Sequence, residues 1–322
     1  MNILGLKDIE IAHQRIAPHI ARTPLLHSPA LGTQAGFPLW LKAENSQITG
    51  SFKLRGALNK ILSLSSEDLA KGIVASSAGN HALGVAHVAR MLQLESVELF
   101  VQANAAPAKI AKLRGYNVHL HLVGQTFDEA QAAALTRVEH AGSTFVSPYD
   151  DIEVIAGQGT CGLEIMQDLP DADTIVVPVG GGGLIAGIAI AAKSLNPRVR
   201  IVGVNPAASP SALMSKRDGR PYDPYDHGPT LALALAGGFG RVPYEVGMQK
   251  IDDIVLVTDD EIMLAMIAMI DSHQVLLEAS GAAGLAAVLS GKIKCAGKCV
   301  AVLSGGNIDA QTLKTVLNKS LI

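Results

Sequence analysis

The chain has 322 residues, of which 48% are apolar and 4% aromatic, and its formal net charge is −3. This length allows two domains of ordinary size or one large domain. Because acidic and basic residues are mixed along the chain and aromatic residues are scarce, the composition argues against nucleic acid or a membrane surface as a partner. We expect the partner to be a small molecule.

Cysteine usage and the N-terminal residues indicate a reduced compartment. The three cysteines are too few and too irregularly spaced for a disulfide framework or a closed zinc site. Charged residues between Lys7 and Arg15 would interrupt the apolar segment of a signal peptide. The longest apolar stretch, Ile262 to Ile270, is about half a membrane span. The sequence therefore predicts a cytoplasmic protein.

Short β-rich runs alternate with Ala-rich helical patterns along almost the whole chain. In order, the runs are Ile73–Ser76, Val97–Val101, Val118–Leu122, Thr144–Val146, Thr174–Val179, Arg200–Val204, Asp253–Val257 and Cys299–Leu303. This alternation is typical of an α/β fold in which helices cover both faces of parallel sheets. No linker or repeat divides the chain, so we expect a small domain nested within a larger one.

Composition also predicts loops and one helix start in the second half. Residues 205–229 and 237–247 are rich in Gly and Pro, and we expect both to be long surface loops. Thr258 to Glu261 matches a capping box in front of the apolar run Ile262 to Ile270.

The run Gly50 to Ala57 places Lys53 at the start of a predicted helix, with Ser51 as the expected N-cap and Phe52 beside the amine. The positive end of a helix and a neighbouring ring would lower the pKa of the lysine amine, which suits a nucleophile that forms a Schiff base. An exposed lysine on an amphipathic helix is the alternative for this run taken alone.

Two strand-to-helix turns carry polar residues. Ser76 to His81 follows the strand that begins at Ile73, and its hydroxyl, amide and imidazole groups could hold a carboxylate, although ordinary helix capping would also account for them. Ser304 to Asn307 follows the last predicted strand. Because open α/β sheets bind ligands at the carboxyl ends of their strands, these turns are candidates for one site.

Four consecutive glycines, Gly180 to Gly183, stand between a predicted strand and a helical run that begins at Leu184. Glycine lets successive backbone N–H groups converge on one anion, and the helix N-terminus adds partial positive charge. No Lys-Ser or Lys-Thr follows, which excludes the P-loop of nucleoside triphosphatases. The turn predicts a site for the phosphate of a small cofactor; a flexible loop is the alternative.

Two other patterns do not predict sites. Gly157 to Gly162 matches the dinucleotide fingerprint as a string of letters, but residues 150–156 before it are not strand-like. His119 and His121 alternate onto one face of a predicted strand without a visible third ligand, so we do not expect a metal pair.

Five motifs, in this order and spacing, resemble those of the fold type II pyridoxal-phosphate enzymes. They are Gly50–Ala57, Ser77–His81, Ile155–Thr160, Pro178–Gly183 and Leu303–Asp309. The match is to the serine/threonine ammonia-lyase (threonine dehydratase) and serine racemase family, and it covers essentially the full chain. Because little sequence follows Asp309, we expect an unregulated, catabolic form.

The resemblance implies an architecture and an assembly. Two doubly wound parallel-sheet domains of the tryptophan synthase beta-like architecture would hold the active site between them. The large cofactor-binding domain would consist of residues 1–69 and 148–322, and the small mobile domain of residues 70–147. A homodimer is also implied.

The resemblance implies roles for individual residues. Pyridoxal 5'-phosphate would be bound covalently by Lys53 and packed by Phe52, with Asn80 at its 3-hydroxyl and Ser304 at its pyridine nitrogen. Its phosphate would be held by the backbone of Gly180, Gly181, Gly182, Gly183 and Leu184. The substrate carboxylate would be surrounded by Ser77, Ala78, Gly79, Asn80 and His81.

The implied reaction removes water from a 3-hydroxy amino acid such as L-threonine or L-serine and yields a 2-oxo acid and ammonia. Lys53 would take the Cα proton. A hydroxyl at the pyridine nitrogen does not hold a proton there as a carboxylate would, which favours elimination over transamination. Other 3-hydroxy amino acids (3-hydroxyaspartate, phenylserine or an ectoine-catabolism intermediate), racemisation and β-replacement are alternatives.

Departures from the family pattern bear on metal and substrate. Members with a divalent-cation site commonly carry acidic ligands where this chain has Asn205, Ser209 and Ser211, so we expect no divalent metal. The Thr-Ile-Ala-Asp-Gly-like run appears as Thr230 to Ala234, without its acidic residue and glycine, which leaves the substrate range open. Ala78 stands where the racemase has its opposite-face serine, so racemisation should be minor.

Overall fold

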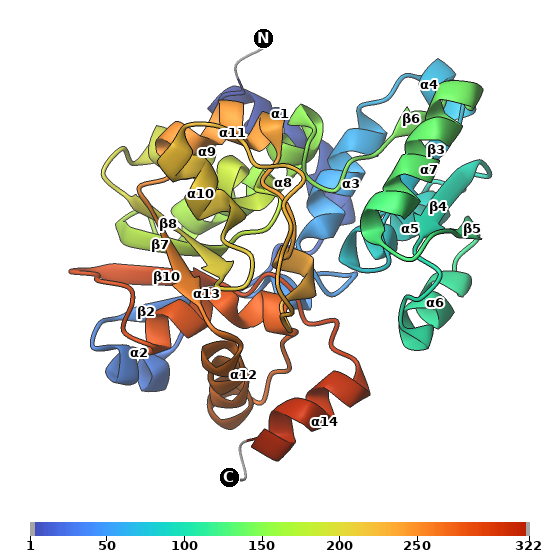
Figure 1. Cartoon of the computed structure of the whole chain (residues 1–322). Helices are drawn as coiled ribbons and strands as arrows, with labels where there is room; N and C mark the ends of the chain where they lie inside the picture. Colours follow the sequence, from blue (N-terminus) through green and yellow to red (C-terminus); the bar gives the residue numbers. More distant parts are fainter. Residues whose placement is uncertain (1–3, 320–322) are drawn as a thin grey trace.

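The computed structural model describes residues 4–319, and within this range the strands form two sheets (Figure 1). The six-stranded sheet has the order β1-β2-β10-β7-β8-β9, and the four-stranded sheet has the order β5-β4-β3-β6. Within these sheets β1 pairs with β2 antiparallel, and the other neighbouring strands are parallel. The strands are β1 (Leu25–His27), β2 (Leu39–Lys42), β3 (Ile73–Ser76), β4 (Val97–Val101), β5 (His119–Leu122), β6 (Thr144–Phe145), β7 (Ala172–Pro178), β8 (Arg200–Pro206), β9 (Asp253–Val257) and β10 (Lys298–Val302).

Helices cover both faces of the six-stranded sheet. Alternate strand residues point to opposite faces, so Val176 and Val202 pack against α12 and α13, while Ile175 and Val177 pack against α8 and α9. Both layers are almost wholly aliphatic, which allows the helices to approach the sheet closely. The helices of this part are α1 (Leu6–Ile16), α2 (Pro29–Ala35), α8 (Ile152–Asp168), α9 (Gly183–Leu195), α10 (Ser211–Asp218), α11 (Arg241–Gly247), α12 (Asp259–His273), α13 (Ala279–Leu289) and α14 (Ala310–Lys319).

The four-stranded sheet lies within residues 73–145, between the two stretches of chain that build the larger sheet. Its helices are α4 (Ser66–Ala70), α5 (Asn80–Met91), α6 (Pro107–Arg114) and α7 (Phe127–Ala141). A further helix, α3 (Lys53–Leu62), contacts both α5 and α8 and so packs between the two sheets (Figure 1). Short 3-10 helices are η1 (Ala17–His19), η2 (Glu44–Ser46), η3 (Leu233–Leu235) and η4 (Met248–Lys250).

The predicted α/β architecture with parallel sheets is confirmed, and the capping box is present: Thr258 Oγ1 accepts the N–H of Glu261, whose carboxylate accepts the N–H of Thr258. The run Gly157 to Gly162 lies inside α8, in agreement with its rejection as a nucleotide-binding turn. Among the described residues, no helix is long and apolar enough to cross a membrane.

The expectation of two long surface loops is wrong in part. Residues 205–229 contain α10, and residues 237–247 contain α11. Asn205 and Ser209 are fully buried, and so is Phe239, which packs in the core beneath α9. After α10, however, the chain up to Pro229 has no helix or strand, and Gly219, Pro224 and Pro229 are exposed, so this part is the expected surface loop.

Candidate active site

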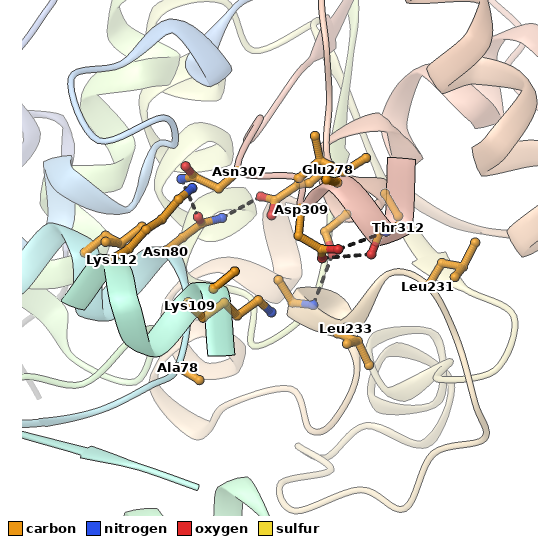
Figure 2. Close-up of a pocket in the computed structure, with 18 residues that line it drawn as sticks. Ala78, Asn80, Lys109, Lys112, Leu231, Leu233, Glu278, Asn307, Asp309 and Thr312 are labelled. Atoms are coloured by element: carbon orange, nitrogen blue, oxygen red, sulfur yellow. Dashed lines mark hydrogen bonds between the residues drawn. The ribbon is translucent and has the colours of Figure 1, made fainter. Parts of the chain in front are cut away.

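Two adjoining cavities lie at the junction of the two sheets. The smaller, of about 40 Å³, is lined by Lys53, Ser304 and the glycine turn, and the larger, of about 330 Å³, is shown in Figure 2. They share part of their walls. The predicted turns after β3, β7 and β10 therefore meet in one place, as expected of strand ends on parallel sheets. The shared residues are Asn80, Ala234, Glu278 and Ser280.

The glycine turn offers a run of unpaired backbone donors. Within the described part of the chain, no carbonyl or side chain accepts a hydrogen bond from the N–H groups of residues 180–185. The first bond of α9 runs from the Ala186 N–H to the Gly182 carbonyl at 3.0 Å. Buried N–H groups need an acceptor, and those at a helix N-terminus favour an anion. This turn therefore fits a phosphate group.

Neighbouring groups also require glycine in this turn. A Cβ at Gly180 would lie 2.9 Å from the carbonyl oxygen of Ala234, and a Cβ at Gly181 would overlap the ring of Tyr149. The Tyr149 hydroxyl donates a hydrogen bond of 3.0 Å to Asp223. Burial and the charge of Asp223 hold the pKa of Tyr149 well above its usual range, so the phenol is neutral. Tyr149 lies outside the five sequence motifs.

Lys53 lies at the first residue of α3, with its amine 5.0 Å from the centroid of the Phe52 ring. The amine donates a hydrogen bond of 2.7 Å to the carbonyl oxygen of Pro148. Burial lowers the pKa of Lys53 from 10.5 to about 8, and the charge of Glu278 opposes this shift. The direction is the predicted one, but its main cause is loss of water rather than the helix end.

The prediction that Ser51 caps α3 is wrong. The N-cap is Phe52, and the Ser51 hydroxyl is buried without a partner among the described residues. Ser51 instead forms an isolated β-bridge with Gly305, and the Phe52 N–H binds the carbonyl oxygen of Ser304 at 3.2 Å. These contacts hold the turn that carries Lys53 against the turn that carries Ser304.

The turn from Ser77 to His81 leads from β3 into α5. The Ser77 hydroxyl accepts the Gly79 N–H at 3.1 Å, whereas the N–H groups of Ala78 and Asn80 have no acceptor within residues 4–319. The imidazole of His81 is buried and pairs with the Val146 carbonyl at 2.8 Å. Burial lowers its pKa to about 3, so the ring is neutral. It lines neither cavity, so its ring is not part of the candidate site.

Asn80 belongs to a hydrogen-bonded group of three side chains (Figure 2). Its amide donates to Glu278 at 2.5 Å, and its carbonyl oxygen accepts from Asn307 at 2.8 Å. Burial raises the pKa of Glu278, while the bond from Asn80 and nearby lysines lower it. These bonds fix the orientation of Asn80. Glu278 was missed from sequence, where it only precedes an Ala-rich helical run.

Of the three residues at which we expect no divalent metal, Asn205 and Ser209 are hydrogen-bonded to the protein backbone, whereas the buried hydroxyl of Ser211 has no partner among the described residues. The Asn205 amide donates to the Val179 carbonyl at 2.8 Å, and its oxygen accepts the N–H groups of Ala212 and Leu213 at the start of α10. Ser209 exchanges hydrogen bonds with the backbone of Gly237. The structure contains no group of three His, Cys, Asp or Glu side chains that could hold a metal among the described residues.

A buried ion cluster supports the helix that carries Lys53. Arg55 pairs with Glu44 and with Glu164, each at 2.8 Å, and Lys42 pairs with Glu164 at 2.6 Å. All four side chains are at most 1% exposed. Because each charge has a partner of opposite sign, the cluster fixes α3 against β2 and α8.

The sequence and the fold both have close relatives. A family model described as "pyridoxal-phosphate dependent enzyme" matches residues 16–305. The L-threonine ammonia-lyase of Geobacter sulfurreducens is 43% identical over 98% of this chain and 78% of its own length. The catabolic L-threonine dehydratase of Escherichia coli is 41% identical over 97% of this chain and 96% of its own length.

Solved structures agree with these matches. A processed threonine deaminase isoform from Solanum lycopersicum aligns with a TM-score of 0.91 at 36% identity, covering 97% of this chain and 86% of that one. Maize serine racemase aligns with a TM-score of 0.90 at 33% identity, covering 99% of this chain and 98% of that one.

Proposed function

The chain belongs to the family of pyridoxal-phosphate-dependent enzymes and has their fold type II architecture, and from this premise we propose that it removes water from a 3-hydroxy amino acid such as L-threonine or L-serine. It is a pyridoxal-phosphate-dependent lyase of the threonine ammonia-lyase type. The products would be a 2-oxo acid and ammonia. The observation that carries the proposal is the row of unpaired N–H groups at residues 180–185 beside the Lys53 amine.

The residues around the smaller cavity fit the cofactor. We propose that the backbone from Gly180 to Leu184 holds its phosphate, that Phe52 packs against it, and that the Ser304 hydroxyl faces its pyridine nitrogen. Asn80, oriented by Glu278 and Asn307, would meet its 3-hydroxyl. All of these residues except Asn307 line the smaller cavity, which supports the assignment.

Pyridoxal 5'-phosphate, when bound, supplies an aldehyde that captures amines and a ring that accepts electrons from Cα. Lys53 is the proposed covalent attachment point, and its free amine would be the base that takes the Cα proton. Its pKa of about 8, lowered from 10.5, makes the neutral amine a minor but far larger fraction near neutral pH than it is for an ordinary lysine. The carbonyl of Pro148 orients the amine through their hydrogen bond.

The turn from Ser77 to His81 is the proposed site for the substrate carboxylate. The N–H groups of Ala78 and Asn80 supply free donors at the N-terminus of α5, which favours an anion. Ser77 and Gly79 would shape the turn, since the Ser77 hydroxyl accepts the Gly79 N–H. His81 would contribute only its backbone, because its ring is buried against Val146.

We also propose the domain division and the assembly. Residues 1–69 and 148–322 would form the large domain, and residues 70–147 a small domain that closes on the substrate. The position of the four-stranded sheet within residues 73–145 supports this division. A cytoplasmic homodimer follows from the family resemblance, and sedimentation of the purified holoenzyme tests the dimer.

Replacement of Lys53 tests the assignment. In the Lys53→Ala variant, release of 2-oxobutyrate from L-threonine should fall to background, and the visible absorbance of the lysine-bound cofactor should disappear. Lys71→Ala, which removes an exposed lysine engaged only in pairs with Glu67 and Asp68, is the matched control. A Lys53→Ala enzyme with normal turnover would refute the mechanism.

A further inference from the structure

We propose that the larger cavity receives the side chain of a 3-hydroxy amino acid that carries a second anionic group, and that Lys109 and Lys112 of α6 bind this group. The inference rests on the proposed function, since it names the class of substrate for that site. It concerns residues that the motifs of the sequence do not include.

The larger cavity continues from the proposed substrate carboxylate site. Its wall includes Ala78, Gly79 and Asn80, and it adjoins the smaller cavity that contains Lys53. The side chain of serine ends at its hydroxyl and that of threonine adds only a methyl group. A volume of about 330 Å³ falls within the range of pockets that hold larger ligands. The cavity therefore has room for a side chain that extends beyond Cβ.

Lys109 and Lys112 lie one helical turn apart on the same face of α6, and both line this cavity. In Figure 2, the side chain of Lys109 extends from α6 toward the opposite wall. No carboxylate in residues 4–319 lies within ion-pair distance of either amine, and no acceptor binds them. Two adjacent ammonium groups without partners are suited to an anion.

The acidic residues of the cavity are already engaged. Asp309 accepts the N–H of Thr312 at 2.9 Å and its hydroxyl at 2.8 Å, which places both carboxylate oxygens in hydrogen bonds at the start of α14. Glu278 accepts from the Asn80 amide. Hydrogen bonds from Thr312 and the charge of Lys109 lower the pKa of Asp309, and burial raises the pKa of Glu278 against the charges of Lys109 and Lys112. Within residues 4–319 the two carboxylates thus act on the lysines only through space, and α6 carries positive charge that no direct ion pair engages.

The apolar part of the cavity wall determines where the anionic end of a ligand would lie. Leu83, Leu231 and Leu233 line the cavity and offer no hydrogen-bond donors from their side chains, and Leu233 is 63% exposed. A ligand would place its apolar stem along these leucines and its charged end at α6, because burying a charge against apolar groups without a partner is costly. The shape and the charge of the cavity thus select the same orientation.

Binding of unreactive substrate analogues tests the inference on the holoenzyme. L-Aspartate and L-glutamate carry a second carboxylate but no β-hydroxyl, and L-2-aminobutyrate is the uncharged comparison. By calorimetric titration, the better of the two diacids should bind more tightly than 2-aminobutyrate. In the double variant Lys109→Gln/Lys112→Gln, the affinity for this diacid should fall roughly tenfold or more, while the affinity for 2-aminobutyrate serves as the reference. A fall of this size is expected for the loss of charge-assisted hydrogen bonds.

Turnover supplies the second measurement. The ratio of kcat/KM for 3-hydroxyaspartate to that for threonine should fall by about tenfold or more in the double variant. Arg114→Gln is the matched control, because Arg114 is an exposed cation of the same helix that does not line the cavity. Equal loss for both substrates, or diacids that bind no better than 2-aminobutyrate, would overturn the inference. Lysine-dependent diacid binding without release of any 2-oxo acid would instead uphold the inference and refute the proposed reaction.

Discussion

The amine of Lys53 is hydrogen-bonded to the carbonyl oxygen of Pro148 at 2.7 Å, although the two residues are 95 positions apart in the chain. The bond joins the first turn of α3 to the segment that carries Tyr149, whose ring lies against the glycine turn. The proposed nucleophile, the aromatic residue and the phosphate cradle are therefore connected through two neighbouring residues.

The lowered pKa of Lys53 predicts how cofactor attachment depends on pH. Only the neutral amine attacks an aldehyde, and the pKa of about 8 means that the protonated form dominates below this pH. The rate of attachment of pyridoxal 5'-phosphate to cofactor-free enzyme should rise with pH and level off above about 8. Stopped-flow absorbance measures this rate. A rate that continues to rise toward pH 10.5, the ordinary pKa of lysine, would contradict the shift.

Substitution in the glycine turn should abolish most of the cofactor affinity. Gly181→Asp would bring a side chain into the space of the Tyr149 ring and a negative charge into the phosphate cradle. Cofactor titration of variants with native circular dichroism measures the effect. Gly228→Asp is the control, because a Cβ there would meet its nearest neighbour at an ordinary 3.6 Å. Unchanged affinity in Gly181→Asp would mean that the phosphate binds elsewhere.

Racemisation should be a minor reaction. Inversion at Cα needs an acid or base on each face of the carbanion, and Ala78, which lines the larger cavity, can neither give nor take a proton. Chiral analysis of L-serine incubated with the enzyme in deuterated water should show pyruvate in large excess over D-serine. The same product analysis of the Ala78→Ser variant, which has a hydroxyl at this position, is the matched comparison. Comparable amounts of pyruvate and D-serine from the wild-type enzyme would assign the enzyme to the racemase branch.

Chelation of divalent metal should leave activity intact. The oxygen atoms of Asn205 and Ser209 already serve backbone groups, and both are neutral, whereas magnesium and calcium prefer carboxylates. The assay compares 2-oxobutyrate release before and after treatment with a chelator. Loss of activity that micromolar magnesium or calcium restores would show that a cation site has been overlooked.

Breaking the buried ion cluster should destabilise the fold. Burial raises the pKa of Glu164, but the hydrogen bonds and charges of Arg55 and Lys42 outweigh burial and lower it. Glu164→Gln leaves these cations short of negative charge and should cost about 3–5 kcal/mol of unfolding free energy in denaturant titrations. Glu67→Gln, in an exposed pair with Lys71, should cost less than about 1 kcal/mol. Equal stability of the two variants would contradict this account.

The same cluster predicts a dependence on acid. Because the pKa of Glu164 is lowered on folding, its stabilising contribution is present above its ordinary pKa of 4.5 and is lost as the pH falls below that value. Glu164→Gln should therefore lose less stability than the wild-type protein in this range.

The sequence predicted the parts of the fold that follow from periodicity. The bounds of β3, β4 and β9 agree with the predicted runs, since each is a short apolar run followed by a turn. It missed β1 and β2, which are short and lack an alternating pattern. From the sequence, Lys42 in β2 would be expected at the surface because it is charged. It is buried because it pairs with Glu164, which lies far along the chain. Such a partner leaves no local signal.

In the candidate site, too, the residues of local motifs could be predicted from the sequence, and the residues that depend on distant contacts could not. Lys53 and Gly181 belong to local motifs whose geometry depends on a helix start, so the sequence identified them. Glu278, Tyr149 and Lys109 reach the cavities from segments without a motif, and only the packing of the two sheets brings them there. The error at Ser51 has a similar origin, because its bridge to Gly305 comes from the other end of the chain.

The ion cluster also has a consequence for the order in which the protein is synthesised. Lys42, Glu44 and Arg55 leave the ribosome early, but Glu164 follows 109 residues after Arg55. The strands of the four-stranded sheet are all translated in that interval. The nascent N-terminal segment therefore carries two cations and one anion, an excess of one positive charge that Glu164 balances only when α8 emerges. The strands of the inserted sheet are thus all synthesised before the ion cluster can be completed, because the cluster includes a glutamate that follows them in the chain.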